Sequence, residues 1–143
     1  MFLVLLKVTC TLLAGFLCGS TLYSSLVEIP VRQQLSEEEQ MKNWKLVFEK
    51  AHKLSKTSGL ITCVLTLVVW YITSNVLWLA CSLILFLILP YTVLLLAKTN
   101  EVLLHSKSTI GLSKYIKQWD RLHHGRTAIC FVGFLIYLVA IAS

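Results

Sequence analysis

Charged residues are confined to two short stretches of this chain, and this confinement limits the folds open to it. Nineteen of the twenty charged side chains lie in residues 28–56 and 98–126, and the exception is Lys7. Residues 57–97 between them form an uncharged run of forty-one residues, and a shorter uncharged run lies outside each stretch. A bilayer core about 30 Å thick takes roughly 20 residues of helix to cross. The long run therefore predicts two crossings, and each shorter run predicts one.

The composition agrees with a protein that lies in lipid. Only 14% of the 143 residues are charged and 57% are hydrophobic, whereas a soluble domain has about 25% charged residues. One small core cannot hide that much apolar surface from water. We expect an all-α fold, a bundle of four transmembrane helices that forms a single domain over residues 1–143.

Helix signals divide the chain into four segments. We expect helices over residues 2–26, 36–72, 76–104 and from 113 to the end. Glu28 and Pro30 are expected to end the first helix, and Ser36 with Glu39 has the spacing of a capping box at the start of the second. The second helix is about 55 Å long at 1.5 Å per residue, so its first third is expected to project into the cytosol. Pro90 is expected to kink the third.

The distribution of basic residues predicts an orientation. Twelve of the thirteen Lys and Arg residues lie in the two polar stretches. By the positive-inside rule these stretches face the cytosol and both termini lie on the opposite side. The endoplasmic reticulum and the plasma membrane are both compatible with this pattern. The first twenty residues could instead be a signal peptide, but Lys7 interrupts their apolar run, which favours a retained helix.

Composition also argues against several classes of function. The net charge of +6 is split between two patches that contain the acidic residues as well, which is typical of a membrane surface and not of a nucleic-acid site. The five cysteines form no CxxC pair and are expected to be buried thiols. The four histidines show no HxxxH spacing. We therefore expect no metal site and no cofactor, with a haem or metal protein as a minority alternative.

Four helices in this order bring the polar ends of the segments to one face of the membrane. The candidate functional residues there are His52, Thr92, Thr99, Asn100, Glu101, Trp119, Asp120, His123, His124 and Arg126. Trp119, His123 and Arg126 lie at positions i, i+4 and i+7, on one stripe of a helix. They offer an aromatic wall, a base with a usual pKa of about 6.5 and a fixed cation. His124 points about 100° away from His123.

Each candidate also has a structural interpretation. The Trp119 stripe resembles an interfacial belt, in which aromatic rings and arginine lie at the lipid headgroups, and from this helix alone the belt is the commoner arrangement. Asn100 can simply link two helices. His52 on its own is more often solvated or packed than catalytic. Glu101 and Asp120 are expected to be solvated, although either could orient a histidine.

Several motifs together resemble a known family. They are Gly19 followed by Pro30, then Pro90-Tyr91-Thr92, Thr99-Asn100-Glu101-Val102-Leu103, and Trp119-Asp120-Arg121-Leu122-His123-His124-Gly125-Arg126. Their order and spacing resemble the anthrone oxygenase-like family of small four-helix membrane proteins. The resemblance implies a four-helix bundle. For characterised relatives it also implies oxidation of phenolic polyketide anthrones to anthraquinones by O2, without a dedicated organic cofactor.

The first hypothesis for function is therefore such an oxygenase. His123, or alternatively His52, removes a proton from the acidic methylene of a hydrophobic substrate that enters from the bilayer. Arg126 and Asn100 stabilise the phenolate oxygen, and Trp119 is a stacking wall. His52, Thr92 and Thr99 line the substrate site.

The second hypothesis is a non-catalytic tetraspan protein that scaffolds an assembly or organises lipid. Gly15 and Gly19 form a small-xxx-small pair, which lets a neighbouring helix approach closely in lipid. That pair would bind a second copy or another membrane protein, and the charged start of the second helix would dock a partner.

Overall fold

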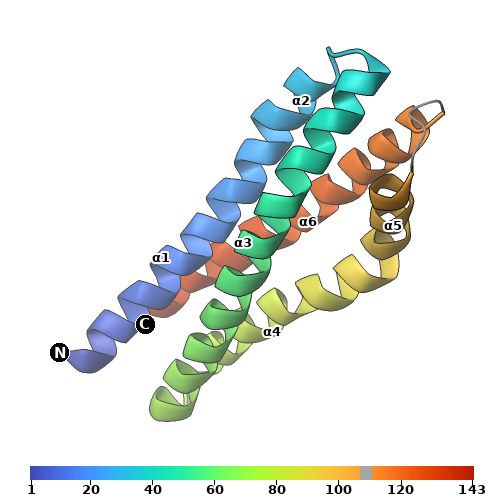
Figure 1. Cartoon of the computed structure of the whole chain (residues 1–143). Helices are drawn as coiled ribbons and strands as arrows, with labels where there is room; N and C mark the ends of the chain where they lie inside the picture. Colours follow the sequence, from blue (N-terminus) through green and yellow to red (C-terminus); the bar gives the residue numbers. More distant parts are fainter. Residues whose placement is uncertain (107–110) are drawn as a thin grey trace.

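The chain forms four long helical rods, and every regular element that the structure describes is helical. The structure is a computed structural model that describes residues 1–106 and 111–143 (Figure 1). The α-helices are α1 (Phe2–Tyr23), α2 (Ile29–Arg32), α3 (Glu37–Thr73), α4 (Val76–Tyr91), α5 (Ala97–His105) and α6 (Ser113–Ala142). Two π-helical segments, Ser24–Glu28 and Thr92–Leu96, join α1 to α2 and α4 to α5. Among the described residues, four rods are long and apolar enough to cross a membrane, as predicted.

The first rod is longer than predicted, because it runs without a break over Phe2–Arg32. The expectation that Glu28 and Pro30 end it is wrong. Proline removes one intrahelical hydrogen bond and crowds the preceding turn. Here the wider π-helical turn of Ser24–Glu28 lies directly before it, and such turns absorb a local misfit in a helix. Two charged side chains, Glu28 and Arg32, are thereby carried on the same rod as the apolar span.

The third helix has the capped start that its sequence predicts. The Ser36 hydroxyl accepts from the backbone N–H of Glu39, whose carboxylate accepts from the backbone N–H of Ser36 at 3.0 Å. The helix continues through Gly59 to Thr73 and ends at Ser74, which has a φ of 52°. The predicted reversal at residues 74–75 is confirmed.

The first turns of α3 do not stand free of the bundle but pack against α5 and α6. Met41 and Trp44 on these turns are buried in a cluster with Leu103 of α5 and Ile116 of α6. The Lys45 ammonium donates to the Ser106 carbonyl at 3.0 Å. The polar end of α3 is therefore one wall of the bundle.

The α4 and α5 helices form one bent rod, and the bend lies between them (Figure 1), where the π-helical segment Thr92–Leu96 follows Pro90. The predicted kink is confirmed. The Tyr91 hydroxyl donates to the Leu122 carbonyl of α6 at 2.8 Å. A Cβ added at Gly125 would overlap this hydroxyl, so α6 needs a glycine where the bent rod touches it. The bend is thus held against the part of α6 that carries the candidate histidine.

The connection between α2 and α3, the end of α5 and the start of α6 lie at one end of the bundle, and the two termini lie at the other (Figure 1). One buried cluster, which includes Val69, Trp78 and Tyr137, fills the terminal end, and the cluster around Trp44 fills the polar end. The polar ends of the helical segments therefore come together at one end of the bundle, as expected.

Gly15 contributes to packing within the chain. A Cβ added there would lie 3.1 Å from the Phe134 ring of α6, whereas nothing lies within 4 Å of one added at Gly19. The two glycines therefore do not share one free surface.

Candidate functional site

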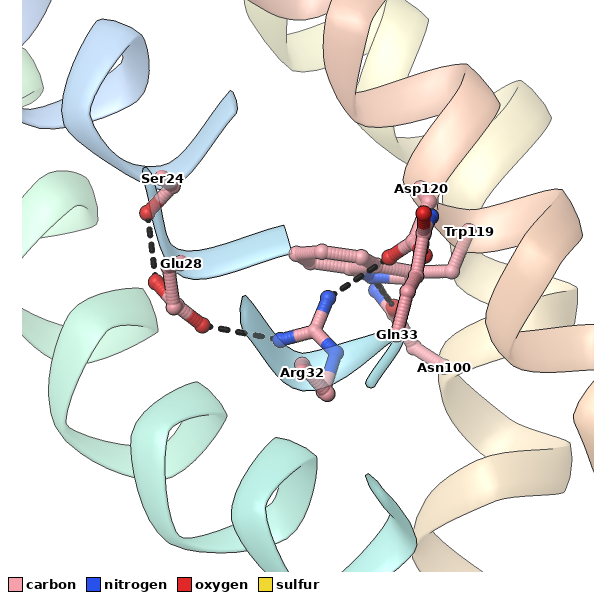
Figure 2. A network of polar contacts seen from close by, with 7 residues as sticks. All are labelled: Ser24, Glu28, Arg32, Gln33, Asn100, Trp119 and Asp120. Atoms are coloured by element: carbon pink, nitrogen blue, oxygen red, sulfur yellow. Dashed lines mark hydrogen bonds and ion pairs between the residues drawn. The ribbon is translucent and has the colours of Figure 1, made fainter. Parts of the chain in front are cut away.

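A chain of charged and polar side chains links the end of the first rod to α6 (Figure 2). Arg32, which is only 1% exposed, donates from Nη1 to Glu28 Oε1 at 2.8 Å and from Nη2 to Asp120 Oδ1 at 2.6 Å. The Ser24 hydroxyl donates to the other Glu28 oxygen at 2.7 Å. Gln33 donates to the other Asp120 oxygen at 3.0 Å. The guanidinium is held by two carboxylates, and each carboxylate has a further donor.

This network explains how ions can be buried at the edge of the membrane. Removing ions from water is costly unless opposite charges and hydrogen bonds compensate them. Glu28 and Asp120 together compensate Arg32. About two helical turns from the Arg32–Asp120 pair, the Ser25 and Thr127 hydroxyls lie 2.8 Å apart and join the same two rods. The two links fix the register between the first rod and α6.

The expectation that Asp120 is solvated is wrong, because its side chain is buried against Arg32. The sequence offers no local signal for this contact, since the two residues are 88 positions apart. Glu101, for which the same was expected, is exposed.

Trp119 and His123 lie inside the bundle. Their rings stack with centroids 4.8 Å apart and an interplanar angle of 19°. Trp44 meets the Trp119 ring edge-on at 5.8 Å, and the Arg32 guanidinium lies 5.5 Å from the same ring. The exposed fraction is 8% for Trp119 and 2% for His123. The interfacial belt is therefore the wrong interpretation of these two residues.

Asn100 is hydrogen-bonded to Trp119. Its side-chain oxygen accepts from the indole N–H of Trp119 at 2.9 Å (Figure 2). This bond links α5 to α6, which is the structural interpretation of Asn100. The amide therefore orients the aromatic ring and does not line the pocket.

A pocket of about 80 Å³ lies between the first rod, α3 and α6. Its polar and aromatic lining consists of Ser20, Ser24, Glu28, Arg32, Trp44, Phe48, His52, Ser55, Trp119, His123 and Arg126. On α3 the rings of Trp44, Phe48 and His52 form a ladder, with successive centroids 4.6 Å and 5.1 Å apart. Trp44 is buried, Phe48 is half-buried and His52 is exposed. The ladder runs from the core of the bundle to its surface.

Several polar atoms of the lining residues have no hydrogen-bond partner within residues 1–106 and 111–143. They are both ring nitrogens of His123, the indole nitrogen of Trp44 and Nε of Arg32. Buried polar groups in native proteins are nearly always paired. Four of the six unpaired buried side-chain atoms among the described residues belong to residues of this pocket, and the other two are Asn43 Oδ1 and Trp78 Nε1.

The structure brings some of the predicted site residues together and leaves the others apart. Trp119, His123, Arg126 and His52 meet at the pocket, and His124 is exposed. Asn100 lies behind Trp119. Thr92 and Thr99 are elsewhere.

The two threonines lie on the bent rod, away from His123. The Thr92 hydroxyl donates to the Ile88 carbonyl of its own rod at 2.7 Å. Thr99 is buried beside a separate hollow with Lys98 and Tyr115. Neither residue lines the pocket that contains His123.

Sequence reasoning missed most of the pocket lining, including its charged and aromatic residues Glu28, Arg32, Trp44 and Phe48. The sequence contained a spacing signal for the charged pair and another for the aromatic pair. Glu28 and Arg32 are opposite charges at i and i+4 next to an apolar span, and ionisable groups near a membrane interior are often functional. Trp44 and Phe48 have the same spacing, which His52 extends by one more turn.

Metal ligands do not gather in the part of the chain that the structure describes. No group of three His, Cys, Asp or Glu side chains is placed to hold an ion there. The five cysteines are free thiols, and all but Cys63 are buried.

The fold and the site define a multi-pass membrane protein with four helices that span the bilayer and a buried aromatic and polar pocket near one end. A family model described as anthrone oxygenase matches residues 44–136, well over half of the chain. The chain belongs to the anthrone oxygenase family. The matched segment contains Trp44, Asn100, Trp119, His123 and Arg126. No curated protein and no solved structure matches the chain.

Proposed function

We propose that the protein is a membrane-embedded oxygenase that uses O2 to oxidise a flat, hydrophobic phenolic substrate of the anthrone type to a quinone. The observation that carries the proposal is His123, a buried imidazole that lines the pocket, stacks on Trp119 and has no hydrogen-bond partner among the described residues. Family membership supports the same chemistry. A fold alone does not define a reaction, so the proposal depends on this site.

The chemistry asked of His123 is removal of one proton. An anthrone carries an acidic methylene between two aromatic rings. When His123 accepts a proton from it, the carbanion that remains can transfer electrons to O2 and form a carbon–oxygen bond. Loss of water from the resulting peroxide leaves a carbonyl, so one oxygen atom enters the product and the other leaves as water. A general base placed in this way contributes about 100-fold to 10,000-fold in rate.

Arg126 and Trp119 complete the site. Arg126 is half-buried, lines the pocket and has no ion-pair partner in residues 1–106 and 111–143. Its guanidinium can therefore bind a phenolate oxygen of the substrate. Trp119 offers a flat face, and the bond from Asn100 fixes the orientation of its ring. Asn100 thus acts through Trp119 and does not contact the substrate.

The substrate enters by displacing side chains of α3. A cavity of about 80 Å³ holds a few water molecules, whereas ligand pockets are roughly 300–1,000 Å³. Phe48 and His52 form the outer part of the aromatic ladder and are the least buried of its rings. Their movement opens the pocket while Trp44 and Trp119 keep its inner wall. His52 then contacts the substrate at the entrance.

Two neighbouring histidines provide the test. Membranes that contain the protein are supplied with anthrone, and quinone formation and O2 uptake are measured. His123→Ala is expected to lower turnover at least 100-fold, whereas the control His124→Ala, which changes an exposed residue, is expected to retain it. Equal turnover by the two variants would contradict the assignment of His123 as the base.

For orientation, we propose that the polar end of the bundle faces the cytosol and that both termini lie on the other side. The proposal is supported by the sequence, in which twelve of the thirteen basic residues lie in the two polar stretches. The alternative of a non-catalytic scaffold has less support. Gly15 packs against Phe134 of its own chain, which removes half of the glycine pair on which partner binding depended.

A further inference from the structure

We propose that the indole N–H of Trp44 donates a hydrogen bond to the carbonyl oxygen of the bound substrate, on the side opposite His123. This inference rests on the proposed function and names the group that stabilises the charge produced by proton removal. Stabilisation of a substrate oxygen was expected of Arg126 and Asn100, but Asn100 lies behind Trp119 and does not line the pocket.

The position of Trp44 supports this role. Its side chain is 1% exposed and lines the pocket, and no described residue accepts from its nitrogen. Its two ring neighbours are the stacked Phe48 at 4.6 Å and the edge-on Trp119 at 5.8 Å. A phenyl ring and an indole supply no conventional acceptor. A buried N–H without an acceptor is unfavourable, and a ligand oxygen removes that cost.

The Trp119 indole and both terminal nitrogens of Arg32 already have hydrogen-bond partners within the chain. The Trp119 N–H is bonded to Asn100. Both terminal nitrogens of Arg32 are bonded to carboxylates, which leaves only its Nε unpaired. Arg32 is therefore held in place by its own chain, and Trp44 is the indole available to a ligand.

The chemistry of an anthrone calls for a base and a hydrogen-bond donor at separate places, and His123 and Trp44 line the pocket from different helices. Trp44 lies on α3 and His123 lies on α6, and both rings contact Trp119. In an anthrone the methylene and the carbonyl lie on opposite edges of the central ring. When His123 takes a methylene proton, the C–H electron pair delocalises through the ring and the carbonyl oxygen becomes an oxyanion. A hydrogen bond from a donor to this oxygen becomes stronger as the negative charge develops, which lowers the barrier to proton removal.

Trp78 provides a matched control. It is 0% exposed, and its indole nitrogen also has no partner in the described residues. It packs with Tyr137 in the terminal cluster and does not line the pocket. Trp44→Phe and Trp78→Phe therefore remove the same atom from similarly buried positions, and only Trp44 lines the pocket.

The binding test compares two flat molecules that differ at the carbonyl. Dissociation constants of anthrone and 9,10-dihydroanthracene are measured without O2 for the full-length protein in detergent. The wild type is expected to bind anthrone about 3-fold to 10-fold more tightly, the range expected for one net hydrogen bond. Trp44→Phe is expected to bind the two equally, and Trp78→Phe is expected to keep the preference.

A second measurement follows proton removal itself. In D2O without O2, the protein is expected to exchange the methylene hydrogens of anthrone for deuterium. Trp44→Phe is expected to slow this exchange about 100-fold, the loss typical for one oxyanion donor, while Trp78→Phe exchanges at the wild-type rate.

Each outcome decides a different claim. Exchange by Trp44→Phe at the wild-type rate would overturn the role of Trp44 and leave the oxygenase proposal intact. Equal wild-type affinity for the two molecules would do the same, and it decides the matter even if Trp44→Phe does not fold. A wild-type protein that neither binds anthrone nor exchanges its hydrogens would overturn the proposed function, and the role of Trp44 with it.

Discussion

Arg32 donates to Asp120 at 2.6 Å with both side chains buried, and this ion pair fastens the end of the first membrane rod to the last helix. Trp119 is the residue next to Asp120, and its ring contacts the same guanidinium. The charged network and the aromatic wall of the pocket are therefore in direct contact through Arg32. The stability of the network and the geometry of the pocket are expected to change together.

Arg32→Gln is expected to destabilise the protein by about 3–5 kcal/mol, because it leaves two buried carboxylates without a cation. Asp120→Asn is expected to cost less, since Glu28 still compensates Arg32. Thermal unfolding in mild detergent measures both. Arg121→Gln, a change at an exposed neighbour, serves as the control and should stay within about 0.5 kcal/mol of the wild type. An Arg32→Gln protein as stable as this control would mean that the ion pair does not hold the rods together.

Gly125→Ala is expected to destabilise by about 1–3 kcal/mol, because its methyl group overlaps the Tyr91 hydroxyl in a packed contact. Adding Tyr91→Phe removes that oxygen and should recover part of the loss. Gly59→Ala is the control, since its methyl group meets nothing within 4 Å and alanine favours a helix by about 0.5–1 kcal/mol. Urea or thermal unfolding separates the three variants, and no difference between the two glycine sites would refute the contact.

Asn100 and Trp119 are expected to be energetically coupled. Asn100→Leu leaves the indole N–H without its acceptor, at a cost of about 1–3 kcal/mol. In Trp119→Phe that N–H is gone, so the same change at Asn100 should cost less. A double-mutant cycle on unfolding free energies measures the difference. Additive effects would show that the bond contributes nothing to the position of the ring.

The two polar segments are expected on one side of the membrane. Single cysteines placed at the exposed positions Gln34 and Lys114 should react with an impermeant maleimide from the same side of sealed vesicles. A cysteine at Ser143 should react only from the other side. The wild-type protein gives the background, since four of its five cysteines are buried. Labelling of the Gln34 and Lys114 positions from opposite sides would contradict this arrangement, because the residues that line the pocket could not then meet at one end of the bundle.

The fold could be predicted from charge placement because a bilayer imposes a length on every uncharged run. Helix signals such as Ser36 with Glu39 are local and therefore readable, and the observed start of α3 agrees with them. The continuation through Pro30 was not readable, because it depends on a π-helical turn that no residue type specifies. The buried state of Arg32 depends on an ion pair between distant segments, which no local pattern encodes.

The orientation of Trp119 and His123 could have been predicted from the rest of their helix. The same stripe of α6 continues through Thr127, Cys130 and Tyr137, all of which are buried. In lipid, small and polar residues mark the face of a helix that contacts other helices. A belt of headgroup contacts would not extend along that stripe. Asn100 was correctly placed at the polar end of the bundle. Its hydrogen bond to the Trp119 indole could be seen only in the structure.

The most direct test of the account follows oxygen atoms from ¹⁸O2. Membranes that contain the wild-type protein and anthrone should form quinone that carries one ¹⁸O atom, and His123→Gln should form almost none. Quinone without ¹⁸O, or equal labelled product from the His123→Gln protein, would contradict oxidation by O2 in the pocket of His123.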